Sequence, residues 1–287
     1  MRKLLIAIAI FVSQVGVMNA GEPDKALHNK CIYPTVMLEG TNPLYGGNGT
    51  GVIVKSIKKD DKYINYVFTC AHVLAQTPPR IVMPKEGSND IPKLIPQKYE
   101  YQVKIGVYED WSRLVAIDVY NCEVLCVNQG YSTDTALIRF FSDKEMPVAD
   151  ICEDPKVYIG NQVCRVGCGL NEPFRVDFGK VNSVVKSILD RQSAATKNTY
   201  RISALTLPGD SGGPVFDDEH KLFGLAQLIR GFNMTPENHL PVFHMAYVLP
   251  IERFTKDEVI VSYLDGKEPK KSLLEIIHEA ADSRNSD

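Results

Sequence analysis

The chain has 287 residues, of which 44% are hydrophobic and 23% charged, and its formal net charge at pH 7 is −3. Acidic and basic residues alternate along the chain without a Lys/Arg block, so the composition gives no support to a nucleic-acid partner. The length is ample for a buried core, in one large all-β domain or in two fused units.

The first element in chain order is an apolar segment at the N-terminus. A basic pair, Arg2 and Lys3, precedes an almost uninterrupted apolar run that ends in small residues at Ala20. This pattern is typical of a secretory signal over residues 1–20, whereas a membrane anchor would need about 20 apolar residues. We therefore expect a secreted or periplasmic protein that keeps no stable membrane association after signal removal. Residues 21–30 would form an N-terminal segment or a short propeptide.

Short β-strands are predicted for most of the remaining chain. The candidates are β-branched or aromatic runs separated by Gly, Pro, Asn or Asp, a pattern that favours a sandwich or a barrel. They fall into two groups of about six, on either side of residues 141–155, which read as a connection. The segments are 49–57, 63–71, 101–109, 115–127 and 135–141, then 156–168, 174–188, 200–207, 213–217, 221–229 and 241–250.

One helix is predicted near the end of the chain, in an extension over residues 256–287. Ser272 and Glu275 form a capping box, in which each side chain can satisfy a free backbone N–H of the first turn. Apolar residues then recur at helical spacing as far as Ala281. We expect this amphipathic helix to pack on the surface of its own domain rather than to bind a partner.

The seven cysteines do not form a metal-binding pattern. Four of them make two CxxxC pairs inside strand-like runs, Cys122 with Cys126 and Cys164 with Cys168. Residues four apart in a strand are separated by about 13 Å, too far for a mutual disulfide and awkward for one metal ion. We expect buried or cross-strand cysteines, at least one free thiol and no metal. The others are Cys31, Cys70 and Cys152.

The strongest chemical signal is the octet from Leu207 to Pro214, LPGDSGGP. Glycines on both sides of Ser211 permit backbone torsions that other residues resist. Consecutive amides can therefore point at one spot beside the Ser211 hydroxyl, which is what an oxyanion hole requires. A hydroxyl in this setting is a candidate nucleophile, provided that a base takes its proton.

His72 is the candidate base. Of the six histidines, it alone ends a hydrophobic strand at a small-residue turn, in VFTCAHV. The partner that would orient it is a carboxylate, and Asp134 directly precedes the apolar strand TALIRFF. An acid at the inner end of a core strand is costly unless it is paired. Asp118 is the rival, but its position within an alternating strand predicts exposure to solvent.

Together these segments resemble the chymotrypsin/trypsin-like serine protease family. TCAHVL is similar to the family's histidine motif, TDTALIRF to its aspartate motif and PGDSGGPVF to its serine motif, in the family's order. Over residues 31 to about 255 the resemblance implies an all-β fold of two six-stranded antiparallel β-barrels, 31–142 and 156–255. It also implies catalysis without a cofactor. His72 would be general base and acid, Asp134 its orienter and Ser211 the nucleophile, with the amides of Gly209 and Ser211 as oxyanion hole.

The departures from the family pattern indicate which members of the family the chain resembles most. Digestive members have a Cys directly after the histidine and another four residues before the serine, where this chain has Val73 and Leu207. The pattern is closer to bacterial HtrA-like proteases, which usually carry PDZ domains; too few residues follow 255 for one. We therefore expect a stand-alone protease domain. The spacing from His72 to Asp134 is long for HtrA-like members, which implies an enlarged loop around residues 76–100.

The resemblance also indicates where a substrate side chain would bind. The residue six before the nucleophile lies at the base of the primary pocket, and here it is Leu205, which cannot compensate a positive charge. We expect uncharged small or apolar side chains before the scissile bond. The lining residues would be Leu205, Thr206, Ala226, Gln227 and Leu228.

Asp210 raises a question about activation. In zymogen-type members of the family, the corresponding acid pairs with a new N-terminus that cleavage releases. The nearest candidate start, CIYP at residues 31–34, departs from the family's pattern. Either another group satisfies Asp210 or a propeptide over residues 21–30 is removed.

Two other functions remain open from the sequence. The chain could be a non-catalytic binding module on the same fold, or a hydrolase that acts on esters by the same mechanism. The family habit favours protein or peptide substrates. The sequence leaves the oligomeric state undetermined.

Overall fold

The computed structural model describes residues 24–41, 47–74, 80–82, 93–95, 101–109, 113–128, 134–172, 174–186, 198–235 and 238–267. The predicted signal over 1–20 and the predicted helix that starts at Ser272 lie outside these residues. Among the helices that the structure describes, none has the length and apolar character needed to cross a membrane.

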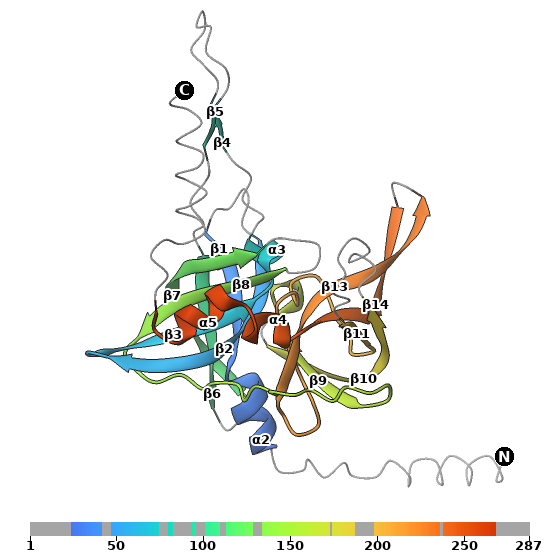
Figure 1. Cartoon of the computed structure of the whole chain (residues 1–287), viewed down its shortest axis with the longest axis horizontal. Helices are drawn as coiled ribbons and strands as arrows, with labels where there is room; N and C mark the ends of the chain where they lie inside the picture. The colour runs from blue at the N-terminus through green and yellow to red at the C-terminus, as the bar shows by residue number, and fades with distance from the viewer. Residues whose placement is uncertain are drawn as a thin grey trace, which may run out of the picture.

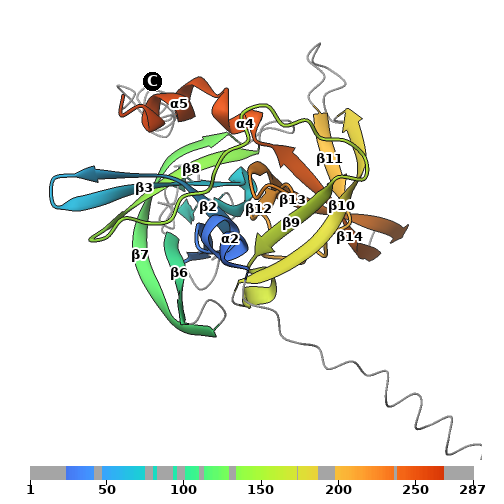
Figure 2. The ribbon, with the colours of Figure 1, turned by 90° about the horizontal axis from the view of Figure 1, so that it is seen from below.

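Two closed six-stranded antiparallel barrels lie side by side, as the resemblance implies (Figures 1 and 2). The first has the strand order β1-β2-β3-β8-β7-β6. Its strands are β1 (Thr35–Gly40), β2 (Asn48–Lys59), β3 (Lys62–Thr69), β6 (Tyr101–Glu109), β7 (Arg113–Asn128) and β8 (Thr135–Ser142). Alternate residues such as Val36, Val103 and Phe140 fill its interior. The predicted enlarged loop carries a small two-stranded sheet, β4 (Arg80–Val82) with β5 (Lys93–Ile95).

The second barrel has the strand order β10-β11-β14-β13-β12-β9. Its strands are β9 (Gln162–Gly167), β10 (Arg175–Lys186), β11 (Asn198–Ile202), β12 (Pro214–Phe216), β13 (Leu222–Thr235) and β14 (Asn238–Pro250). A single 3-10 turn, η2 (Gly169–Asn171), lies between β9 and β10. Buried Val163, Ile202 and Phe223 contribute to its core.

Several boundaries differ from the predicted ones. Strand β1 was not among the predicted segments, and the predicted strand 200–207 ends at Ile202 because the chain turns there into the serine loop. Ahead of β1, the described chain forms α2 (Lys25–Leu27) and the π-helical turn η1 (His28–Ile32), which buries Cys31 and Ile32.

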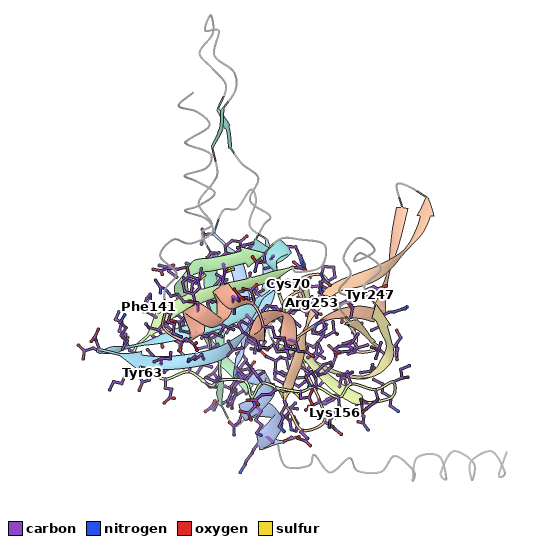
Figure 3. All side chains as sticks on the ribbon, in the orientation of Figure 1. Tyr63, Cys70, Phe141, Lys156, Tyr247 and Arg253 are labelled. Atoms are coloured by element: carbon purple, nitrogen blue, oxygen red, sulfur yellow. The ribbon has the colours of Figure 1, made fainter. Side chains whose placement is uncertain are left out.

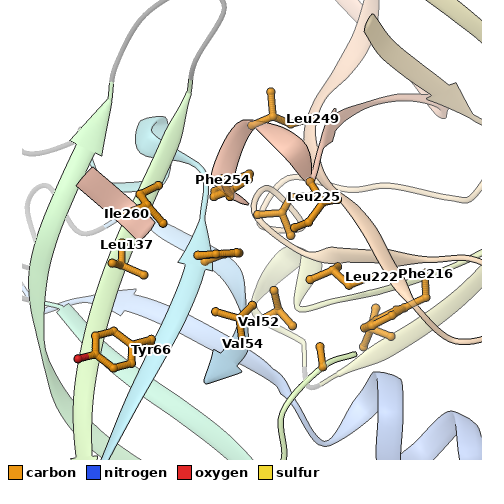
Figure 4. Close-up of a cluster of buried hydrophobic side chains, with 14 of the residues drawn as sticks. Val52, Val54, Tyr66, Leu137, Phe216, Leu222, Leu225, Leu249, Phe254 and Ile260 are labelled. Atoms are coloured by element: carbon orange, nitrogen blue, oxygen red, sulfur yellow. The ribbon is translucent and has the colours of Figure 1, made fainter. Parts of the chain in front are cut away.

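A third core joins the two barrels (Figure 4). Val52, Phe68 and Leu137 of the first barrel meet Phe216 and Leu225 of the second within one buried cluster. Two short helices after the second barrel, α4 (Glu252–Thr255) and α5 (Glu258–Leu264), close this cluster. The barrels therefore share apolar surface instead of being joined only by their connection.

Replacing Phe254 by Ala should test the shared core. Phe254 is fully buried and stacks on Phe68 with ring centroids 4.8 Å apart. We expect Phe254→Ala to lower the free energy of unfolding by about 3–5 kcal/mol, measured by urea titration. The control is Val259→Ala on the exposed side of α5, which should change it by about 0.5 kcal/mol or less. A loss below about 1 kcal/mol for Phe254→Ala would mean that α4 does not hold the interface.

All seven cysteines are free thiols, and five of them are buried. Cys122 and Cys126 lie on β7 and Cys164 on β9, in the strands that their sequence runs predicted. Cys31 lies within hydrogen-bond reach of Cys164; that hydrogen bond and burial raise the pKa of the Cys31 thiol far above its usual range. These thiols act as small apolar side chains of the core.

Candidate active site

His72 is held on a short helix at the rim of the first barrel. Strand β3 ends at Thr69, and α3 (Ala71–Leu74) follows after Cys70. The other three residues of α3 are buried, whereas 37% of the His72 side chain is exposed. The Tyr101 hydroxyl contacts the carbonyl oxygens of Val73 and Leu74 at 3.1 and 3.0 Å. The imidazole thus projects from a rigid base.

Asp134 contacts His72 through both of its carboxylate oxygens. Its Oδ2 lies 2.9 Å from His72 Nδ1, and its Oδ1 accepts the His72 backbone N–H at 2.9 Å. The Ala71 N–H donates to the Asp134 carbonyl at 3.2 Å, so both segments are joined through backbone as well. A carboxylate at Nδ1 selects the tautomer with the proton there, which leaves Nε2 as the acceptor.

The rival carboxylate lies elsewhere. Asp118 sits on β7 with a partly exposed side chain and forms an ion pair with Lys144 at 3.2 Å. Asp118 is only partly exposed, because its neighbours Ile117 and Val119 occupy the more exposed face of β7. Of the two candidates, the structure brings Asp134 to His72.

Ser211 lies in the loop between β11 and β12, which two glycines shape. Gly209 has φ +97° and Gly212 φ +82°, backbone torsions that side chains resist. A Cβ on Gly212 would lie 2.2 Å from the Thr50 carbonyl oxygen and 3.1 Å from the Cys70 amide nitrogen. The loop is therefore pressed against the segment that carries His72, and only glycine permits that approach.

Thr50 fastens the serine loop to the first barrel. Its N–H donates to the Ser211 carbonyl at 2.9 Å and its hydroxyl to the Gly209 carbonyl at 2.8 Å, while the same hydroxyl accepts the Cys168 N–H at 3.0 Å. From the sequence, Thr50 was expected only as part of an ordinary strand. The glycines on either side of it could have indicated a close approach of another segment, since a Cβ on Gly49 would collide with Val73 and approach the Ser211 carbonyl.

The Ser211 hydroxyl donates to the carbonyl oxygen of Gln227 at 3.1 Å. Among the described residues, neither the Gly209 nor the Ser211 amide N–H donates to an acceptor of the chain. Two free amides, one on each side of Asp210, beside a partly exposed hydroxyl are suited to receive a developing negative charge.

The predicted pocket residues are not equivalent in the structure. Leu205 is half-buried, and its carbonyl accepts from Arg165 Nε at 2.8 Å, whereas Thr206 is buried. The Ala226 side chain packs in the core of the second barrel, so this residue faces the serine loop through its backbone, accepting the Gly212 N–H at 2.7 Å. Gln227 is partly exposed, and the Leu228 side chain lies outside the described part of the chain.

Cys70 lies beside the His72–Asp134 pair, in the middle of the molecule (Figure 3). Potential ligand atoms of the three residues are within 4.8 Å of one another. A thiol binds a metal as thiolate, but burial, and then the charge of Asp134, raises the pKa of Cys70 well above its usual value. The thiol instead contacts the Ala226 carbonyl at 3.5 Å.

Comparisons with known proteins identify the family and the fold of the chain. The sequence model of the trypsin-like peptidase domain family matches residues 49–225. A search of curated proteins finds no match.

Solved structures share the fold. The HtrA-type protease AlgW with a tripeptide aligns with a TM-score of 0.56 at 15% identity, over 85% of this chain and 64% of its own. The serine endoprotease from Yersinia pestis aligns with a TM-score of 0.54 at 16% identity, over 84% of this chain and 65% of its own. The chain thus matches less than two thirds of the length of these proteins.

Proposed function

The chain belongs to the trypsin-like peptidase domain family, and from that premise we propose that it is a serine endopeptidase acting on proteins or peptides. The observation that carries the proposal is the two-point contact between Asp134 and His72 beside the glycine-flanked Ser211. We further propose that it works outside the cytoplasm, in the periplasm or after secretion, as its signal-like N-terminus indicates.

The reaction would begin with a rotation of the Ser211 hydroxyl away from Gln227 toward Nε2 of His72. Nε2 takes the proton as the serine oxygen attacks the substrate carbonyl, and Asp134 stabilises the resulting imidazolium. The negative charge on the carbonyl oxygen is received by the amides of Gly209 and Ser211. His72 then returns its proton to the leaving amine, and the acyl-enzyme forms. Water, activated by the same imidazole, releases the product.

A fluorophosphonate probe tests this proposal directly, because it labels a serine only where a base and an oxyanion hole activate it. We expect the wild-type chain to be labelled and Ser211→Ala to remain unlabelled. An unlabelled, folded wild-type chain would favour the non-catalytic binding module. Labelling without cleavage of any peptide, but with cleavage of esters, would favour an esterase.

For specificity, we propose a preference for uncharged small or apolar side chains before the scissile bond. Leu205 supplies no negative charge at the base of the pocket, and the neighbouring Thr206 is buried. A desolvated Lys or Arg of the substrate would lack a partner there. Profiling with a peptide library should return residues such as Ala, Val or Leu at this position. A profile dominated by Lys or Arg would contradict the assignment.

A further inference from the structure

The residue before the nucleophile carries a carboxylate that is sealed inside the protein. Asp210 is fully buried, and a buried carboxylate is strongly unfavourable unless it is paired and hydrogen-bonded. Its Oδ2 accepts the Leu207 N–H at 2.7 Å and lies 2.9 Å from Nη2 of Arg175. Its Oδ1 lies 2.9 Å from Nη1 of Arg165. The partner that the sequence left open is therefore a pair of internal guanidinium groups.

Both arginines come from one hairpin of the second barrel. Asp177 on β10 pairs in register with Arg165 on β9, and Arg175 pairs with Gly167. Residues two apart in a strand share a face, so all four positions point toward Asp210. A Cβ on Gly167 would lie 2.3 Å from both Arg165 Nη1 and Asp210 Oδ1, which explains the glycine.

Asp177 completes the cluster. Its Oδ2 lies 2.6 Å from Arg175 Nε and also contacts Arg165 Nη2, while Arg165 Nε donates to the Leu205 carbonyl at 2.8 Å. Two guanidinium groups thus face two carboxylates, and the four charges sum to zero. Because Arg165 and Asp210 are both fully buried, removing one partner would leave an uncompensated charge inside the barrel.

The cluster fixes the serine loop where catalysis needs it. Asp210 stands between Gly209 and Ser211, whose amides would form the oxyanion hole. We propose that Arg165 and Arg175 are positioning residues that hold this loop in its competent form, so that the enzyme needs no newly released N-terminus. The inference rests on the proposed peptidase function. The nearest start-like segment does not compete for Asp210, since Cys31 and Ile32 are buried in the core between the barrels.

The two possible partners of Asp210, a released α-amino group and the guanidinium groups, differ in their response to pH. An α-amino group has an ordinary pKa of about 7.7–8.0, so a loop held by one is released in alkali. A guanidinium stays protonated throughout that range. Burial lowers the pKa of Arg175, but its hydrogen bond to Asp177 and the charge of Asp210 raise it by more. Among the described residues, the other titratable groups that face the cluster are Glu172 and the buried Cys168 thiol, whose pKa burial raises to about 12.

The first experiment compares two forms of the chain, one that begins at Gly21 and one with a short, cleavage-resistant extension before Gly21. We expect kcat values that agree within about twofold, and no fall in kcat between pH 8 and about 10, where an α-amino group deprotonates. The proposal is overturned if the extended form is inactive until trimmed, or if an alkaline fall moves when the amino terminus is acetylated.

The second experiment removes one guanidinium. Arg175→Gln should lower kcat about 10- to 100-fold with little change in KM, less than or comparable to the cost of deleting an oxyanion donor, about 10²–10³-fold. Arg175→Lys should recover part of kcat at pH 7, because it restores the charge but not the guanidinium fork that contacts both Asp177 and Asp210. The matched control is Arg113→Gln, which breaks the exposed ion pair with Glu109 and should leave kcat unchanged. A folded Arg175→Gln with wild-type kcat would refute the positioning role.

Two readouts keep the outcomes separate. Circular dichroism and the melting temperature show whether Arg175→Gln is folded. If it is not folded, the proposal is decided by the first experiment, which compares wild-type chains with and without the extension before Gly21. Fluorophosphonate labelling of the wild-type chain tests the peptidase proposal by itself. A labelled enzyme that depends on a free N-terminus overturns only the role of the arginines, whereas a folded wild-type chain that is never labelled overturns both.

Discussion

Ser211→Ala is expected to lower kcat about 10⁵- to 10⁶-fold, the magnitude typical of a triad that loses its nucleophile. The Ser211 hydroxyl lies in the loop whose Gly209 and Ser211 amides donate to no acceptor of the described chain. What remains would be the contribution of substrate binding and the oxyanion hole. The measurement is steady-state hydrolysis of a peptide substrate, and KM should change little because the hydroxyl is not part of the pocket.

A matched control exists in the same loop. Ser203 follows β11 directly, and its hydroxyl accepts the Lys180 N–H at 2.9 Å. Ser203→Ala should stay within about twofold of wild-type kcat/KM, as expected of a substitution away from the reacting groups. If Ser211→Ala lost only about tenfold, hydrolysis would have to run through another group and the assignment of the nucleophile would be wrong.

Asp134→Asn is expected to lower kcat about 10⁴-fold, because the amide cannot stabilise an imidazolium and favours the wrong imidazole tautomer. In the structure the two oxygens of Asp134 have different partners, the ring at Nδ1 and the His72 backbone N–H. Asparagine can keep one acceptor for the backbone, but it then presents an N–H₂ to Nδ1. Nε2 would carry the proton and could not accept one from Ser211.

The rival acid supplies the control for this substitution. Asp118→Asn removes a partly exposed ion pair with Lys144, and such pairs are worth about 0–1 kcal/mol of stability. We therefore expect kcat to be unchanged. A large loss in Asp118→Asn together with a small one in Asp134→Asn would reverse the assignment of the carboxylate.

The site residues that could be predicted from the sequence are those that lie in short, recognisable motifs. His72, Asp134 and the glycines around Ser211 each stand in a short motif whose chemistry is unusual for its setting, although His72 and Asp134 themselves are 62 residues apart. The cluster around Asp210 could not be read in this way. Arg165 in QVCRVGC resembles any polar residue of an alternating strand, and only the barrel's closure turns its side chain inward against Asp210.

The direction of the side chains in the predicted pocket wall could not be read from the sequence either. Ala226, Gln227 and Leu228 were expected to line the pocket together, but the register of β13 with β14 shifts between Ala226 and Leu228. The Ala226 side chain packs inside the second barrel. The position of a residue relative to the motif predicted which residues lie near the serine loop, but it did not predict where their side chains point.

Helix α5 shows a different reason for a missed element. Its sequence EVIVSYL is rich in β-branched residues, which favour strands. The Asp257 side chain caps the segment by accepting the N–H groups of Val259 and Ile260, and Ile260 and Tyr263 are buried against the core between the barrels. Capping and tertiary burial thus outweigh local propensity.

The hydrogen bonds of Thr50 attach the Ser211 loop to the first barrel as well as to the second. Ser211 belongs by sequence to the second barrel, yet two carbonyl oxygens of its loop are bound by a residue of β2 in the first. A small sliding of one barrel against the other would therefore change the aim of the serine before it changed the shape of either barrel. The activity that we propose would therefore depend on the alignment of the two barrels as well as on the residues of the site.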